Sequence, residues 1–171
     1  ALNRENSDRQ DLYIQVDTIF KRLAGIGILS VYSVGNDGAG HFRCPGNHKV
    51  GLSVGACDSQ RTMWPRSGGG AFDNGAALLD LPDCVAPGAN VSVIDRDGNY
   101  ETGSGTSLAA PIVAGLAVHY LARSSGTTTV TDLESRILAD CQLVSGNNPQ
   151  GRGLVRLTDE SLAVVAEAKL S

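Results

Sequence analysis

A mostly apolar stretch from Leu108 to Ala122 constrains the fold more than any other feature of this sequence. It is shorter than the roughly 20 residues that a membrane-spanning helix needs, and it contains Pro111, Gly115 and His119. We therefore predict no membrane span and interpret the stretch as a buried helix that begins at Ser107. A helix that is apolar on most sides must be covered by other layers of the same fold.

Short apolar segments provide candidates for those layers. Three short segments are typical of buried strands, at 28–34, which is rich in β-branched residues, and at 50–57 and 78–86. Helical patterns alternate with them, at 9–23, 131–139 and 159–169. We expect Thr131-Asp132-Leu133-Glu134 to form a capping box. Strands that alternate with helices predict an α/β fold with a parallel, layered sheet, and 171 residues suit one domain.

A turn is expected at Asp97-Gly98, between two extended segments at 91–95 and 99–102. The Asp-Gly dipeptide is a strong signal for a hairpin. Asp95 and Asp97 also give the segment a passing likeness to a calcium loop. No glutamate follows at the required distance, so we predict a hairpin here.

The overall charge argues against a polyanion-binding protein. The net charge is -4, from 14 basic and 18 acidic residues, and basic side chains do not cluster in runs. The four cysteines match neither a zinc ribbon nor a Cys-x-x-Cys site, so disulfides and free thiols both stay open. His41, Cys44 and His48 share one loop and could form part of a metal site. A fourth ligand is lacking, and we predict neither a metal nor a cofactor.

The segment Gly103–Pro111 contains the first candidate catalytic residue. Ser107 opens a helix, where unpaired N–H groups converge and the helix dipole favours negative charge. Pro111 lacks the N–H that would pair with the Ser107 carbonyl. Residues that disfavour the local secondary structure in this way are more common at functional sites than elsewhere. The alternative is a closely packed helix start with an ordinary capping serine.

The segment Val34–Gly38 contains the second candidate. Asn36 follows a predicted buried strand, and the carboxyl ends of strands are where open α/β sheets place their sites. Its carboxamide can donate two hydrogen bonds without carrying charge. The alternative is a plain turn, because Asn-Asp-Gly is also turn chemistry.

Taken together, the two segments resemble the subtilisin-like serine peptidase family (subtilases). Gly-Thr-Ser-Leu-Ala-Ala-Pro-Ile-Val-Ala-Gly, residues 105–115, is similar to the nucleophile motif of that family, and 33–38 to its oxyanion segment. Two further similar pieces lie between them in family order, at 54–59 and 82–88. The resemblance extends to about Leu157. It implies the C-terminal portion of a subtilisin-like catalytic domain over 1–171, with a three-layer parallel sheet and flanking helices that are incomplete in this chain.

The resemblance also implies roles for individual residues in a serine endopeptidase. Ser107 would be the acylating nucleophile, and its N–H and the Asn36 side chain would stabilise the oxyanion. A polypeptide substrate would bind between two walls of the specificity pocket. One wall would be a strand that pairs with the substrate backbone, formed by Ala1, Leu2 and Asn3. The other wall would be formed by Ser33, Val34 and Gly35. Arg43 would lie near the pocket base and favour acidic or small residues, unless it faces solvent. Secretion is favoured by the resemblance alone.

The aspartate and histidine of a serine triad are not found in this sequence. The family carries them in Asp-Ser/Thr-Gly and His-Gly-Thr motifs, and neither motif occurs here. His119 lies twelve residues past Ser107 on the predicted helix, about 18 Å along its axis, so we expect a core or pocket-edge role. We predict that the chain alone is inactive or nearly so. The N-terminal portion of the same catalytic domain would be the partner that supplies both residues.

Other functions remain to be weighed against this interpretation. A catalytically inactive subtilisin-like binding module, or a fragment without independent function, is the main alternative. An α/β-hydrolase esterase needs Gly-x-Ser-x-Gly, and Ser107 is followed by Leu108-Ala109 instead. A dinucleotide-binding domain needs Gly-x-Gly-x-x-Gly after a strand, which the sequence does not contain.

Overall fold

The computed structural model describes residues 4–73, 78–124 and 126–157. Three helices and seven strands are found among them. The helices are α1 (Arg4–Gly25), α2 (Thr106–Arg123) and α3 (Val130–Ala139). The strands are β1 (Val31–Ser33), β2 (Leu52–Cys57), β3 (Gly70–Asp73), β4 (Leu78–Leu81), β5 (Cys84–Pro87), β6 (Val91–Ile94) and β7 (Tyr100–Gly103). The helix predicted at 159–169 lies outside the described residues.

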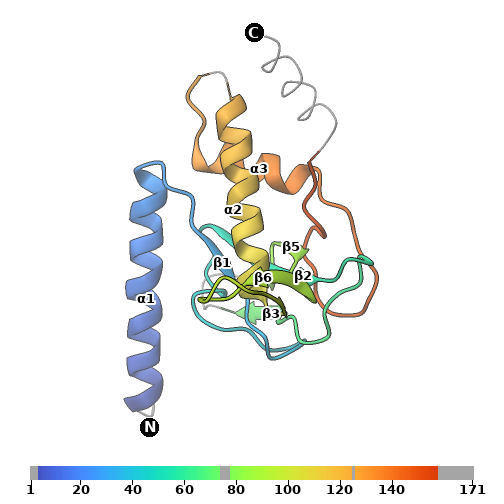
Figure 1. The fold of residues 1–171 in the computed structure, drawn as a ribbon. Helices are drawn as coiled ribbons and strands as arrows, with labels where there is room; N and C mark the ends of the chain where they lie inside the picture. The colour runs from blue at the N-terminus through green and yellow to red at the C-terminus, as the bar shows by residue number, and fades with distance from the viewer. Residues whose placement is uncertain (1–3, 74–77, 125, 158–171) are drawn as a thin grey trace.

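A parallel sheet in the order β1-β2-β5 forms the centre of the described fold, as the sequence predicted. Every residue of β2 is buried, because this strand lies between the other two and under α2. Helix α2 crosses one face of the sheet, and α3 packs against α2 (Figure 1). The main core cluster therefore combines side chains from β2, β5, α2 and α3.

The prediction of a single strand at 78–86 is wrong. The structure divides it into β4, which pairs antiparallel with β3, and β5, which joins the parallel sheet. Pro82 and Asp83 separate the two strands, and Pro82 has no N–H to continue a ladder. β3 lies in the glycine-rich segment 67–75, where no strand was predicted.

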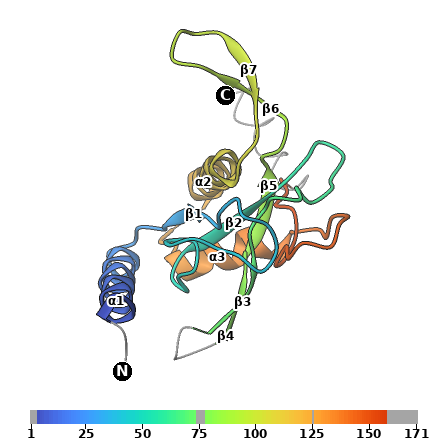
Figure 2. The same cartoon turned by 90° about the horizontal axis from the view of Figure 1, so that it is seen from below.

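The predicted hairpin is confirmed as β6 and β7, which project from the body (Figure 2). Gly98 has a φ of 87°, a conformation that glycine adopts without strain. Asp95 Oδ1 accepts hydrogen bonds from the N–H groups of Asp97 and Asn99, both at 2.8 Å. The carboxylate therefore closes the turn.

Helix α2 is only partly buried, which corrects the expectation of a fully buried helix. Ala109 and Val113 are fully buried against the sheet, whereas Val118 is 65% exposed and Leu121 is 47% exposed. The apolar sequence gave no indication that one side would be open, because all sides of the helix are apolar. Pro111 is accommodated within the helix, which continues to Arg123.

The N-cap of helix α3 lies two residues earlier than the sequence indicated, at Thr129 instead of Thr131. Its capping box is formed by Thr129 and Asp132, not by Thr131 and Glu134. Asp132 reaches back to the Thr129 N–H at 3.1 Å, and the Thr129 hydroxyl accepts from the Asp132 N–H at 3.1 Å. A Thr-x-x-Asp pair satisfies the same two N–H groups as the expected Thr-x-x-Glu.

Helix α1 stands beside the body and precedes β1 (Figure 1). It confirms the helix predicted at 9–23 and extends it at both ends. Its side chains Tyr13 and Phe20 make ring contacts with the body, while Leu12 and Ile14 remain more than half exposed. Among the described residues, no helix has the length and apolar character required to cross a membrane.

Candidate active site

The serine at the start of α2 presents its hydroxyl to solvent. Gly105 precedes the helix in an extended conformation, with φ of 173°, and as the N-cap residue it has no side chain that could cap the first turn. The Ser107 N–H makes no hydrogen bond with the described part of the chain. Ser107 is exposed, whereas its neighbour Thr106 is 1% exposed. The helix start thus offers an exposed hydroxyl and a free backbone donor at one residue.

The asparagine reaches this helix start from the exit of β1. The strand pairing continues past Ser33, because the Val34 N–H donates to the Val54 carbonyl at 3.0 Å. Gly35 then adopts a φ of 116°, which favours glycine and turns the chain out of the sheet. Asn36 follows immediately and is half-buried. The short strand and the glycine turn together aim its side chain at α2.

Thr106 fixes the orientation of the Asn36 carboxamide. Asn36 Oδ1 accepts from the Thr106 N–H at 2.9 Å and from the Thr106 hydroxyl at 2.8 Å. The same hydroxyl accepts from the Gly35 N–H at 3.3 Å. With Oδ1 engaged by a backbone donor, the Nδ2 donors must lie on the other side of the carboxamide. No sequence pattern indicated that Thr106 would orient the Asn36 side chain.

Ser107 and Asn36 converge on one small space beside Gly105. A methyl group placed on Gly105 would lie 3.0 Å from Ser107 Oγ, 3.7 Å from Asn36 Nδ2 and 3.8 Å from Ser107 N. A nucleophilic oxygen and two N–H donors therefore lie within 4 Å of one point beside this glycine. This arrangement is suited to attack on a carbonyl carbon with stabilisation of the negative oxygen that forms.

The predicted pocket wall is only partly within the described residues. Ala1, Leu2 and Asn3 lie outside them. Ser33, Val34 and Gly35 form the exit of β1, where Val34 is fully buried and the Gly35 carbonyl accepts from the Gly68 N–H at 2.9 Å. A side chain on Gly35 would meet Arg43 Cγ at 3.2 Å, so the loop carrying Arg43 runs alongside this exit.

Arg43 faces solvent, which was the alternative to a place at the pocket base. Its side chain is 71% exposed and forms a bidentate ion pair with Asp37, with Nε–Oδ2 at 2.5 Å and Nη2–Oδ1 at 3.0 Å. The hydrogen bond from Arg43 lowers the pKa of Asp37. Because Asp37 already balances the guanidinium charge, the structure gives no support for selecting an acidic substrate residue.

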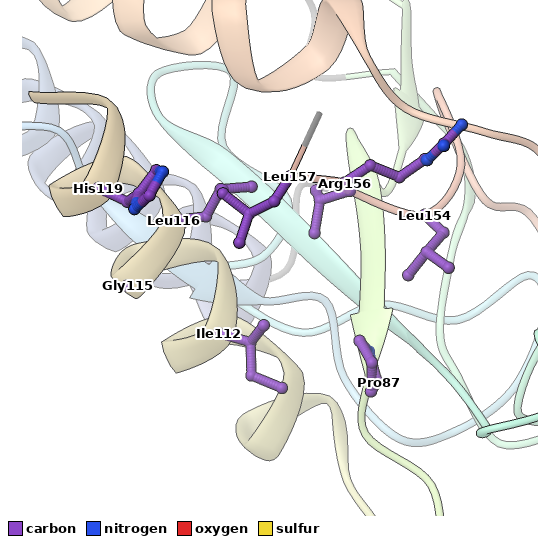
Figure 3. A pocket seen from close by; sticks show the side chains of 9 residues that line it. Pro87, Ile112, Gly115, Leu116, His119, Leu154, Arg156 and Leu157 are labelled. Atoms are coloured by element: carbon purple, nitrogen blue, oxygen red, sulfur yellow. The ribbon is translucent and has the colours of Figure 1, made fainter. Parts of the chain in front are cut away.

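The predicted pocket-edge place of His119 is confirmed. His119 is half-buried on the rim of an apolar cavity of about 410 Å³ (Figure 3). Arg123 Nη1 contacts its ring. Side chains of α2, the end of β5 and the segment 154–157 line this cavity. Ser107 and Asn36 are not among the lining residues, so the cavity is separate from the candidate site.

All four thiols are free, with Cys57 and Cys84 buried. Cys44 and His48 lie close together, but His41 does not join them, and the described residues contain no group of three metal-binding side chains. Asp17, which α1 brings to His48, could not be assigned to this group from the sequence.

The comparisons with known proteins agree on one family. The family model described as "Subtilase family" matches residues 2–153. The chain is 33% identical over 146 residues to the subtilisin-like protease PopC of Myxococcus xanthus (strain DK1622), covering 81% of this chain and 30% of that protein. It is 30% identical over 129 residues to subtilisin Savinase of Lederbergia lenta, covering 75% of this chain and 44% of that protein.

Solved structures show the same fold. The structure of sphericase matches with a TM-score of 0.71 at 23% identity, covering 84% of this chain and 52% of that one. A cold-adapted subtilisin-like serine proteinase matches with a TM-score of 0.64 at 26% identity, covering 82% of this chain and 47% of that one. The chain therefore spans about half of these structures and less than half of the two curated relatives.

Proposed function

The chain belongs to the subtilase family, and from this premise we propose that it forms the C-terminal portion of a serine endopeptidase. Ser107 is the nucleophile of that enzyme. The observation that carries the proposal is the convergence of Ser107 Oγ, Ser107 N and Asn36 Nδ2 on the space beside Gly105. Neither a capping serine nor a plain asparagine turn would require these three atoms to meet.

The proposed reaction proceeds through an acyl-enzyme. Ser107 Oγ attacks the carbonyl carbon of the scissile peptide bond while a base takes the hydroxyl proton. The carbonyl oxygen becomes negative and accepts hydrogen bonds from the Ser107 N–H and Asn36 Nδ2. The carbon–nitrogen bond then breaks, the proton passes to the leaving amine, and water hydrolyses the ester in a second step by the same route.

The base and its orienting aspartate come from the N-terminal portion of the catalytic domain. Two of this chain's histidines have other surroundings: His48 is fully buried against α1, and His119 lies by the separate cavity. The described part of the chain also gives the Ser107 hydroxyl no hydrogen-bond partner. That the chain spans 30% to 44% of two curated peptidase relatives supports a site completed by another segment or chain.

The substrate is a polypeptide held beside the exit of β1. Ser33, Val34 and Gly35 form one wall of the specificity pocket in this proposal. The buried Val34 and the tightly packed Gly35 give this wall little freedom to move. A rigid wall at this place would hold the scissile carbonyl in reach of Ser107.

Labelling with an alkyl fluorophosphonate tests the proposal. Serine attacks the phosphorus atom and fluoride leaves, so only an activated serine reacts rapidly. The chain is treated alone and together with the N-terminal portion of the domain, and the labelled peptide is identified by mass spectrometry. We expect labelling at Ser107 only when both portions are present. Ser107→Ala should abolish it, and Ser92→Ala, at an exposed position on β6, should not.

Each other outcome has a definite meaning. Labelling of the isolated chain at Ser107 would show that a base is present within it and contradict the two-part site. Failure of labelling with both portions present and folded would contradict the peptidase function and favour a binding module.

A further inference from the structure

A second cluster of reactive side chains lies on the loop that follows the exit of β1. Cys44 and His48 are both on this loop, and Cys44 Sγ is 3.6 Å from His48 Nε2. On the opposite side of the same imidazole ring, Asp17 Oδ1 of α1 is 3.7 Å from His48 Nδ1. The three side chains therefore form a row of thiol, imidazole and carboxylate. None of them belongs to the candidate site at Ser107.

The imidazole in the middle of this row is held firmly. His48 has no exposed side-chain surface, and the Tyr13 ring stacks on it with centroids 4.1 Å apart and planes 11° apart. Phe20 contacts it edge-on at 5.3 Å. The Tyr32 hydroxyl donates to the His48 carbonyl at 3.0 Å and fixes the backbone. The ring cannot turn away from Cys44 without disrupting this packing.

One nitrogen of this ring is an unsatisfied polar atom. His48 Nδ1 is buried, and the described residues offer it no hydrogen bond within ordinary range. With its proton on Nδ1, the neutral ring directs this N–H toward the Asp17 carboxylate, whose Oδ1 is 3.7 Å away. That tautomer leaves Nε2 without a proton and able to accept one from the Cys44 thiol. Cys44 is an exposed residue whose thiol is partly buried against His48, so small reagents in solution can reach it.

Burial keeps the resting pair neutral. It raises the pKa of the Cys44 thiol and lowers the pKa of His48, whereas the Asp17 charge acts in the other direction on His48. A preformed thiolate and imidazolium are thus disfavoured. Asp17 nevertheless stabilises the imidazolium at the moment when the thiol proton is transferred. This is the behaviour of a general base oriented by a carboxylate.

We propose that Cys44 is a modification site for small, uncharged oxidants of the hydroperoxide class, with His48 as its base and Asp17 as the positioning residue. A metal site does not fit the row, because Cys44 and Asp17 face opposite nitrogens of one ring and cannot share an ion. A hydroperoxide fits because its leaving group must gain a proton. His48 can return to that group the proton it has taken from the thiol.

The reaction balances with hydrogen peroxide as the oxidant. Cys44 Sγ attacks one peroxide oxygen, the O–O bond breaks and an S–O bond forms. The thiol proton moves to His48 Nε2 and then to the departing hydroxide, which leaves as water. The sulfur is oxidised by two electrons to a sulfenic acid, and the peroxide is reduced.

The experiment compares the oxidation of Cys44 with that of Cys141 in the same sample. Cys141 is a matched control because it is half-buried, its thiol contacts the Ile137 carbonyl at 3.4 Å, and burial raises its pKa to about 11. The folded chain is treated with hydrogen peroxide and dimedone, and sulfenic acid is quantified at each cysteine. We expect Cys44 to react at least about tenfold faster, since a general base contributes about 10²–10⁴.

Two variants separate this mechanism from simple exposure of the thiol. Asp17→Asn should slow oxidation at Cys44 about tenfold or more and leave Cys141 unchanged. His48→Phe keeps an aromatic ring stacked on Tyr13 and should slow Cys44 at least as much. Circular dichroism checks that both variants fold. Unchanged oxidation of Cys44 in Asp17→Asn overturns the proposal, whatever the second variant does.

Discussion

Asn36 Oδ1 accepts hydrogen bonds from both the backbone N–H and the hydroxyl of Thr106, at 2.9 and 2.8 Å. The two residues are 70 positions apart in sequence, so this contact ties the exit of β1 to the start of α2. Because the oxygen of the carboxamide is held in this way, its nitrogen faces the space beside Ser107. The contact thus determines whether the proposed oxyanion site has two donors or one.

Removing the Thr106 hydroxyl should destabilise the chain and disturb the site. In Thr106→Val the Gly35 N–H and Asn36 Oδ1 each lose a partner in a buried place. We expect a loss of about 1–3 kcal/mol in the free energy of unfolding, measured by urea denaturation. Thr106→Ser keeps the hydroxyl and should stay within about 1 kcal/mol. Equal stability of the valine and serine variants would contradict the bridging role.

A methyl group on Gly105 should block the candidate site without unfolding the protein. The extended φ of 173° at this residue accepts an alanine, yet its Cβ would lie 3.0 Å from Ser107 Oγ. We expect Gly105→Ala to fold and to lose fluorophosphonate labelling in the two-part assembly.

Gly115→Ala is the matched control on the same helix. Nothing lies within 4 Å of the position of its Cβ, so the change should stabilise α2 by about 0.5–1 kcal/mol and leave labelling intact. If Gly105→Ala were labelled as fast as Gly115→Ala, the space beside Gly105 would not be the reaction site.

Removing the second donor should lower turnover more than substrate binding. Asn36→Asp keeps an acceptor for the Thr106 N–H but replaces Nδ2 with an oxygen that repels a developing oxyanion. We expect kcat of the two-part enzyme on a peptide substrate to fall by at least about 10²–10³, with little change in KM. A change confined to KM would instead place Asn36 in ground-state binding.

The sequence predicted Ser107 and Asn36 as residues of the candidate site, but not the contact through Thr106 that connects them. Ser107 and Asn36 could be singled out because a helix start and a strand exit have local sequence signals. The role of Thr106 depends on a long-range hydrogen bond, which no local pattern encodes. In the same way, Cys44 and His48 could be noticed because they share one loop. Asp17 reaches His48 only because Tyr13 and Phe20 pack helix α1 against it, and the sequence does not reveal this packing.

The fold was predicted to a similar degree. The parallel sheet, the hairpin at Asp97-Gly98 and the three described helices follow from periodicity and turn residues. The division of 78–86 between two sheets was missed, because apolar runs do not reveal which strand they pair with. The exposed side of α2 was missed because hydrophobicity shows what can be buried, not what covers it.

The stability of the fold should fall as the pH rises through the titration of Asp83. Burial raises its pKa from 3.8 to about 6, while its Oδ2 accepts from the Ser53 N–H at 2.7 Å. The folded state therefore keeps a proton that the unfolded chain releases near pH 4, so the free energy of unfolding decreases between about pH 4 and 6. Two pKa units correspond to at most about 3 kcal/mol.

Asp83→Asn isolates this effect, because it keeps an acceptor for the Ser53 N–H and cannot ionise. The variant should match the parent chain near pH 4 and exceed it in stability by up to about 3 kcal/mol above pH 6. Urea denaturation across this range measures the difference. Glu134, whose pKa is also raised by burial, is present in both proteins, and its charge contributes to the raised pKa of Asp83. A stability difference independent of pH would contradict the assignment.

The most direct measurement is a crystal structure of the two-part assembly after reaction with the fluorophosphonate. Bonding of phosphorus to Ser107 Oγ is predicted, with the phosphonyl oxygen about 2.7–3.1 Å from both Ser107 N and Asn36 Nδ2. An adduct whose oxygen points away from Asn36, or one formed on a different serine, would contradict the account.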